Sequence, residues 1–252
     1  MQLRFRFYAS LLDAFQQYLD SDIIWEKYWG YSETPPHTPE EFRKQQFQSL
    51  IDRINRVHYE NEAVDRGTAF NEVIDCMVEN RGTDKVKVEK LLNNGIVAAL
   101  NATYNNRTFC FPMPLVREVS DYYKGALTQQ YVQAVLPTMF GDVLVYGFID
   151  YVLPFLICDL KTTGRYSVGD FKNHWQHIVY PYAMMENGSK VFDFEYNVVE
   201  FGKSDYNTYT ESYSFVPERD VPKLTQHCED FIRFLQQNRE LITDKKIFNL
   251  AA

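Results

Sequence analysis

The feature that most constrains this chain is a change of hydrophobic pattern near Gly125. After that residue, short runs of β-branched and aromatic residues have the length of strands and are separated by turn signals, which indicates a sheet. Strands are expected over residues 131–139, 143–153, 155–160, 191–201 and 209–216. Residues 170–186, between the third and fourth runs, carry apolar side chains at helical spacing. This order predicts an α/β fold in which helices flank a central mixed β-sheet.

The part of the chain before Gly125 has mainly helical patterns. Helices are expected over residues 9–30, 39–61, 68–79, 85–102 and 114–123. Thr38 is followed by Pro39 and two acidic residues, which is typical of a helix start. A last helix is expected over residues 221–241. We therefore expect one domain, and its parts are N-terminal helical additions (1–125), a sheet with one helix (126–216) and a C-terminal helix (217–252).

Charge and cysteine usage narrow the class of protein. A formal net charge of -8 argues against broad, sequence-blind coating of nucleic acid, although a local basic cleft remains compatible with it. The sequence has neither an apolar stretch long enough to cross a bilayer nor the segments of a signal peptide, so we expect a soluble, cytoplasmic protein without a membrane partner. The four cysteines include no Cys-x-x-Cys pair, so neither a zinc site nor a disulfide framework is expected.

Two acids and a lysine stand out in the strand region. Because side chains two apart on a strand share a face, Asp159 and Lys161 are expected to point the same way, while Cys158 and Leu160 point into the core. Asp150 lies on the preceding strand, and a turn near Pro154 would bring its carboxylate beside that of Asp159. The sequence therefore predicts two adjacent carboxylates and one ammonium group.

Two adjacent carboxylates repel one another unless a cation holds them, and oxygen ligands of this kind suit Mg²⁺ or Mn²⁺. Such a metal lowers the pKa of bound water and neutralises charge on a phosphate. Lys161 would then orient the water or stabilise developing negative charge, which is what phosphodiester hydrolysis requires. The competing interpretation is structural, since an Asp-x-Lys after an apolar run is by itself more often an exposed strand end.

Four short patterns occur in a fixed order around these residues. They are Gly-Thr at residues 67–68 with Asn71 and Asp75 on the same helix face, Gly-x-x-Asp ending at Asp150, Asp-x-Lys-Thr starting at Asp159, and Gln-x-x-x-Tyr from Gln176 to Tyr180. In this order they resemble the RecB-like branch of the PD-(D/E)XK nucleases. The resemblance covers residues 67–180 and implies a restriction-endonuclease-like core.

The resemblance also implies roles for individual residues. Asp150 and Asp159 would bind the metal, Lys161 would be the catalytic lysine, and Asn71 stands where the branch usually has a metal-binding His. The residues expected to support the site or contact substrate are Gln176, Tyr180, Thr162, Thr163 and Arg165. An iron–sulfur cluster, found in some relatives, needs a late group of cysteines, and only Cys228 follows Asp159, so no cluster is expected.

Other residues near these patterns have less specific interpretations. His174 and His177 lie three apart on the expected helix and are candidates for a phosphate contact or a second metal, but histidines are common on amphipathic helices. Glu72 follows Asn71, and adjacent helix positions point about 100° apart, which disfavours joint ligation.

The leading hypothesis is a metal-dependent DNA nuclease, in particular an exonuclease acting in recombination, repair or phage replication. It would act in the cytoplasm, or the host cytoplasm if a phage encodes it, with a helicase or recombinase as a possible partner. One alternative is a non-catalytic protein that kept the fold and binds DNA or another protein, which the Asn at position 71 and the acidic balance favour. Another is a restriction-type endonuclease, which the Gln-x-x-x-Tyr pattern disfavours.

Overall fold

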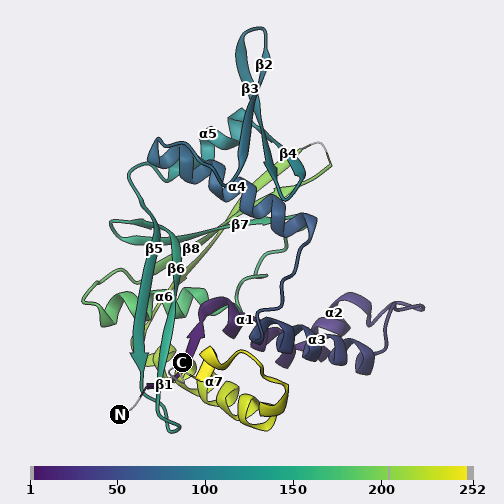
Figure 1. Cartoon of the computed structure of the whole chain (residues 1–252), viewed down its shortest axis with the longest axis vertical. Coiled ribbons are helices and arrows are strands. Elements are labelled where there is room, and N and C mark those ends of the chain that lie inside the picture. The colour runs from purple at the N-terminus through teal and green to yellow at the C-terminus, as the bar shows by residue number, and fades with distance from the viewer. Residues whose placement is uncertain (1–2, 204, 249–252) are drawn as a thin grey trace.

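A mixed sheet forms the centre of the molecule (Figure 1). The computed structural model describes residues 3–203 and 205–248. Six strands are paired in the order β1-β6-β7-β8-β9, with β5 also pairing with β6. Their bounds are β1 (Leu3–Tyr8), β5 (Leu127–Leu136), β6 (Asp142–Leu153), β7 (Leu156–Thr163), β8 (Asp193–Phe201) and β9 (Tyr206–Ser214). The pairs β1–β6 and β7–β8 are parallel and the others antiparallel, so the expected α/β fold with a mixed sheet is confirmed.

Helices surround this sheet and include most of those expected. They are α1 (Ala9–Leu19), α2 (Ser21–Trp29), α3 (Pro39–Ile54), α4 (Glu62–Glu79), α5 (Met113–Tyr122), α6 (Gln176–Glu186), α7 (Pro217–Gln237) and the 3-10 turns η1 (Arg239–Leu241) and η2 (Lys245–Phe248). The expected start of α3 is confirmed, because Thr38 and Glu41 form a reciprocal capping box. The helix expected from residue 170 begins only at Gln176. No helix within residues 3–203 and 205–248 is long and apolar enough to cross a membrane.

The helix expected over residues 85–102 is wrong. That region forms a second, three-stranded sheet of β2 (Lys87–Asn93), β3 (Ile96–Tyr104) and β4 (Arg107–Pro112). Two tight turns with positive φ join the strands, at Asn94–Gly95 and at Asn105–Asn106. Such turns match the twist of antiparallel strands and favour Asn and Gly, so they fix two hairpins where a helix would have to continue. The β2–β3 hairpin projects away from the central sheet (Figure 1).

Two apolar clusters pack on the central sheet. One joins the sheet to α1, α6 and α7, and the other joins it to α4, α5 and the small sheet. Along β7 the side chains alternate between these clusters, since Ile157 belongs to the first while Cys158 and Leu160 belong to the second. The expected inward direction of Cys158 and Leu160 is therefore confirmed, and Asp159 and Lys161 are directed to the side of the sheet that carries α6.

Candidate functional site

The site lies where β6 and β7 stop pairing. Their antiparallel register covers Tyr151–Leu153 and Leu156–Cys158. One step further along, the Leu160 backbone N–H donates to Asp150 Oδ2 at 3.0 Å. The Asp150 carboxylate thus takes the place of a strand carbonyl as acceptor, which fixes it between the two strands.

Three side chains form a closed set of polar contacts beside this point. Lys161 Nζ lies 2.6 Å from Asp159 Oδ2 and donates to Gln176 Oε1 at 2.7 Å. The Gln176 amide donates in turn to Asp159 Oδ1 at 2.6 Å. Asp159 and Gln176 are both buried. Asp159 and Lys161 of β7 and Gln176 of the Gln-x-x-x-Tyr pattern therefore form one cluster, which joins β7 to the first turn of α6.

The cluster holds two acids and one cation. Burial raises the pKa of Asp150 above its usual range, and the neighbouring charge of Asp159 raises it further. Burial alone would lower the pKa of Lys161, but the charges of Asp159 and Asp150 outweigh it, so that pKa lies above its ordinary value. Lys161 is therefore an ammonium group paired with Asp159, and Asp150 has no cation in contact with it among the described residues.

Helix α4 brings Asn71 to the other side of β7. A Cβ on Gly67 would lie 2.9 Å from Thr162 Oγ1, so glycine permits the close approach of helix and strand. Asn71 Nδ2 lies 3.5 Å from the Leu160 carbonyl oxygen, a weak contact. Asn71 Oδ1 is buried and has no hydrogen-bond partner among the described residues. Asp75, on the same helix face, instead accepts from Tyr151 OH at 2.7 Å.

These donors fit a hard divalent cation. Asp150 and Asp159 supply carboxylate oxygens, and the buried Asn71 Oδ1 supplies an acceptor that the described part of the chain leaves unused. No group of three or more His, Cys, Asp and Glu residues in that part of the chain has a metal-binding arrangement. Asp150 and Asp159 could hold such a cation at the fork of the sheet, and Asn71 approaches β7 at the Leu160 carbonyl, between Asp159 and Lys161 in the sequence.

Tyr180, which ends the Gln-x-x-x-Tyr pattern of helix α6, packs against the sheet at Gly147. A Cβ on Gly147 would lie 2.6 Å from the Tyr180 ring, so the glycine of Gly-x-x-Asp makes room for the tyrosine of the later pattern. Tyr180 is buried, with its hydroxyl 3.4 Å from Gln176 Nε2, and therefore supports the site from within the protein. The helix continues through Pro181.

The remaining expected site residues lie at the exit of β7 and on the segment before α6. Thr163 Oγ1 donates to the Arg165 carbonyl at 2.7 Å and accepts from the Arg165 N–H at 3.2 Å, which shapes the turn, and Arg165 is exposed. His174 Nδ1 lies 3.4 Å from Asp13 Oδ2. His177 stacks on Tyr213 at 4.3 Å between ring centroids, and burial lowers its pKa to about 4. Both histidines thus have partners within the protein.

Two residues near the site were not expected from the sequence. Asp13 of α1 accepts from the Trp175 N–H at 2.5 Å and so caps the N-terminus of α6 from a distant segment. The signal for it was an acid within the apolar run Leu11–Phe15. Arg66 precedes Gly67, and its Nε is buried without a hydrogen-bond partner among the described residues. A Cβ on Gly164 would lie 3.9 Å from its guanidinium, which places a cation at the exit of β7.

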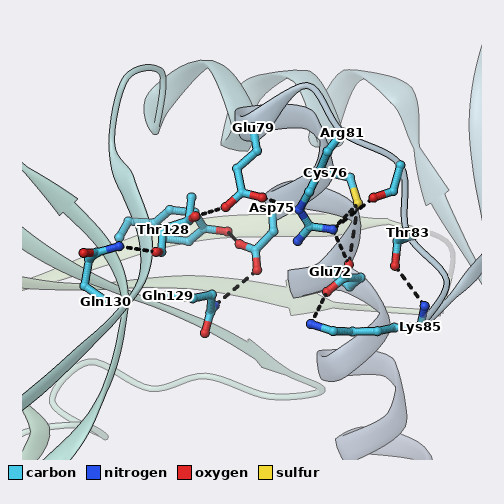
Figure 2. Close-up of polar contacts among 12 residues, drawn as sticks. Glu72, Asp75, Cys76, Glu79, Arg81, Thr83, Lys85, Thr128, Gln129 and Gln130 are labelled. Atoms are coloured by element: carbon cyan, nitrogen blue, oxygen red, sulfur yellow. Dashed lines mark hydrogen bonds and ion pairs between the residues drawn. The ribbon is translucent and has the colours of Figure 1, made fainter.

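A second group of charges, centred on the buried carboxylate of Glu72, lies toward the C-terminal end of α4 (Figure 2). Glu72 faces Arg81 at 2.6 Å and Lys85 at 3.2 Å. Burial alone would raise the pKa of Glu72, but its hydrogen bonds to Arg81, Thr83 and Lys85 lower it to about 2. Arg81 also pairs with Glu79. Glu72 is therefore directed to these cations, and no contact joins it to Asn71, Asp150 or Asp159 among those described for it.

No protein-family model matches the sequence, and no curated protein matches it. Among solved structures, the crystal structure of a protein named SSO0001 is similar, with a TM-score of 0.45 and 9% sequence identity. The similarity covers 93% of this chain and 78% of that chain.

Proposed function

We propose that this protein is a metal-dependent nuclease that hydrolyses phosphodiester bonds of DNA. The observation that carries the proposal is the convergence of Asp150, Asp159, Lys161 and Gln176, from three elements of the chain, on one partly buried cluster. Asn71, whose buried Oδ1 has no hydrogen-bond partner among the described residues, approaches the same stretch of β7 at the Leu160 carbonyl. Surface strand ends do not require such closure, so the catalytic interpretation of Asp-x-Lys gains support over the structural one.

The residues of this cluster have separable tasks. A Mg²⁺ or Mn²⁺ ion held by Asp150, Asp159 and Asn71 would activate water and neutralise phosphate charge. Lys161 keeps its proton because two carboxylates surround it, so it supplies a fixed positive charge for a phosphate oxygen. Gln176 holds the Lys161 ammonium and the Asp159 carboxylate in register, which limits their motion before substrate arrives.

The test is hydrolysis of end-labelled linear DNA by the purified protein. We expect cleavage with Mg²⁺ or Mn²⁺ and none in chelator. Equal cleavage in chelator would remove the metal from the mechanism. If neither metal supports cleavage and the protein still binds DNA without metal, a non-catalytic protein that kept the fold would be favoured.

We further propose that cleavage starts at DNA ends in the cytoplasm. With a net charge of -8, a long electropositive surface is not expected. The affinity for duplex DNA must therefore come from a short region near Lys161 and Arg165. A partner such as a helicase or recombinase could then supply further affinity. We expect linear duplex to be degraded faster than closed circles, with a shallow dependence on salt. Rapid cutting of closed circles would instead point to a restriction-type endonuclease.

A further inference from the structure

A stripe of aromatic side chains, two of them exposed and two partly buried, runs along the sheet toward the site. Tyr131 of β5 and Phe148 of β6 are paired across the two strands, and their ring centroids are 5.2 Å apart. Tyr146 lies 6.4 Å from Tyr131, and Tyr8 of β1 lies 6.1 Å from Tyr146. Phe148 is 57% exposed and Tyr131 is 46% exposed. We call these four residues the aromatic stripe.

Tyr8 packs against the core, whereas Tyr131 and Phe148 of the stripe are exposed. The side chains that alternate with it, such as Val145 and Ile149, are buried in the cluster with α6. Large rings left in water on a sheet face contribute little to folding, because burial is what makes an aromatic side chain stabilising. An exposed row of this kind is a feature of ligand-binding surfaces.

Two arginines accompany the stripe. The Arg6 guanidinium lies over the Tyr146 ring at 5.4 Å, and that of Arg56 lies over the Tyr8 ring at 5.7 Å. Arg56 also donates to Tyr146 OH at 3.3 Å and pairs with Asp244, so Arg56 and Asp244 together carry no net charge. Arg6 Nε is buried without a hydrogen-bond partner among the described residues. Rings and guanidinium groups in alternation match the bases and phosphates of a nucleic-acid strand.

The stripe is continuous with the site. A cavity of about 310 Å³ is lined by Tyr8, Arg56, Tyr146, Phe148 and Tyr180, among others. Tyr180 contacts Gln176, which donates to Asp159, and Phe148 is two residues before Asp150 on the same strand. The cavity therefore connects the stripe to Tyr180 at the fork of the sheet, next to the contact between Gln176 and Asp159.

We infer that the aromatic stripe binds single-stranded DNA and delivers it to the cluster of Asp150, Asp159 and Lys161, an inference that rests on the proposed nuclease function. Bases of a single strand can stack on exposed rings, whereas bases of a duplex are stacked on each other and paired inward. Two arginines neutralise few phosphates, so stacking supplies most of the affinity and salt affects it little.

The test is binding of fluorescently labelled oligothymidylate in chelator, measured by anisotropy. Phe148→Ala and Tyr131→Ala should each weaken binding by about tenfold. Phe155→Ala is the matched control, because Phe155 is 82% exposed on the turn between β6 and β7 and lies outside the stripe. Its affinity should equal that of the parent protein. Circular dichroism should be unchanged in all three variants, since these side chains are exposed.

Three results would overturn the inference. They are failure of the parent protein to bind oligothymidylate, parental affinity of Phe148→Ala, and an equal loss of duplex binding in that variant. The proposed nuclease is tested apart from the stripe by hydrolysis of bis(p-nitrophenyl) phosphate with Mn²⁺, because that ester has no bases. If the parent protein hydrolyses the ester and Phe148→Ala binds oligothymidylate with unaltered affinity, the inferred role of the stripe is wrong and the nuclease proposal stands. If Phe148→Ala loses oligothymidylate binding but the parent protein does not hydrolyse the ester, the nuclease proposal is wrong and the binding role of the stripe stands.

Discussion

Two groups of buried charges lie near α4, and they are balanced in opposite ways. Toward the C-terminal end of the helix, the buried carboxylate of Glu72 lies between the cations Arg81 and Lys85, and Arg81 also pairs with Glu79. At the fork of β6 and β7, two carboxylates lie near the one ammonium of Lys161. The first arrangement satisfies its charges within the fold, and the pKa of Glu72 falls to about 2. The second leaves Asp150 without a paired cation among the described residues and with a raised pKa, so we expect it to cost stability and to favour binding of a cation.

The largest effect should separate the two groups by function. Asp159→Asn and Lys161→Ala should each lower the rate of DNA cleavage by about a thousandfold or more, because each removes a charge needed at the phosphate. Glu72→Gln should cleave DNA at the parental rate. Near-parental cleavage by Lys161→Ala, or loss of cleavage in folded Glu72→Gln, would reverse the assignment of the two groups. Single-turnover rates with linear DNA give the comparison.

Stability should separate the two groups in the opposite sense. Glu72→Gln removes the carboxylate of Lys85 and one of the two carboxylates of Arg81, and both cations reach solvent and can rehydrate. We expect the free energy of unfolding to fall by about 1–2 kcal/mol. In chelator, Asp150→Asn should instead raise it by roughly 1 kcal/mol, because it removes a buried charge beside Asp159.

Urea denaturation measures both effects. The exposed pair of Lys87 and Glu89 supplies a control, since Glu89→Gln should change the free energy of unfolding by less than about 0.5 kcal/mol. A destabilised Asp150→Asn would mean that the Asp150 charge is already compensated in the protein without metal.

The pH dependence of stability sharpens the contrast further. The pKa of Glu72 is depressed in the folded protein, so its stabilisation is present above its ordinary pKa of about 4.3 and is lost as the pH falls toward 2. The difference in unfolding free energy between the parent protein and Glu72→Gln should therefore shrink below about pH 4. Urea titrations at a series of pH values would show this. A difference that stays constant down to pH 3 would indicate a packing effect instead of a charge effect.

The smallest effect concerns the third donor of the site. Asn71→His should tighten Mn²⁺ binding a few-fold, because imidazole is a better ligand than an amide oxygen for this metal. Asn71→Ala should weaken it by a similar factor, since the buried Oδ1 is lost. Fluorescence titration of each variant with Mn²⁺ measures these affinities. Unchanged titrations for both variants would exclude Asn71 from the metal site.

Much of the site could be predicted because the positions of its side chains depend on residues close to one another in the sequence. The alternation of side chains along a strand placed Asp159 and Lys161 on one side, and the hairpin before them brought in Asp150. The same local reasoning gave the capped start of α3 at Thr38. Helix periodicity likewise put Gln176 and Tyr180 on one face, where both are found.

The rest depends on contacts between distant segments or on turns that override periodicity. The cap of α6 comes from Asp13, 162 residues before the Trp175 N–H that it accepts, so no window of sequence contains both. The approach of Asn71 to the Leu160 carbonyl spans 89 residues. In the region of β2 and β3, apolar spacing indicated a helix, but Asn94–Gly95 fixed a hairpin turn instead.

The central claim is that the uncompensated carboxylates bind a metal, and calorimetric titration with Mn²⁺ tests it most directly. The parent protein and Glu72→Gln should show the same binding isotherm. Asp150→Asn and Asp159→Asn should show little heat, because each removes a charged ligand. Equal binding by the parent protein and Asp159→Asn would contradict the account, since the metal would then occupy another part of the chain.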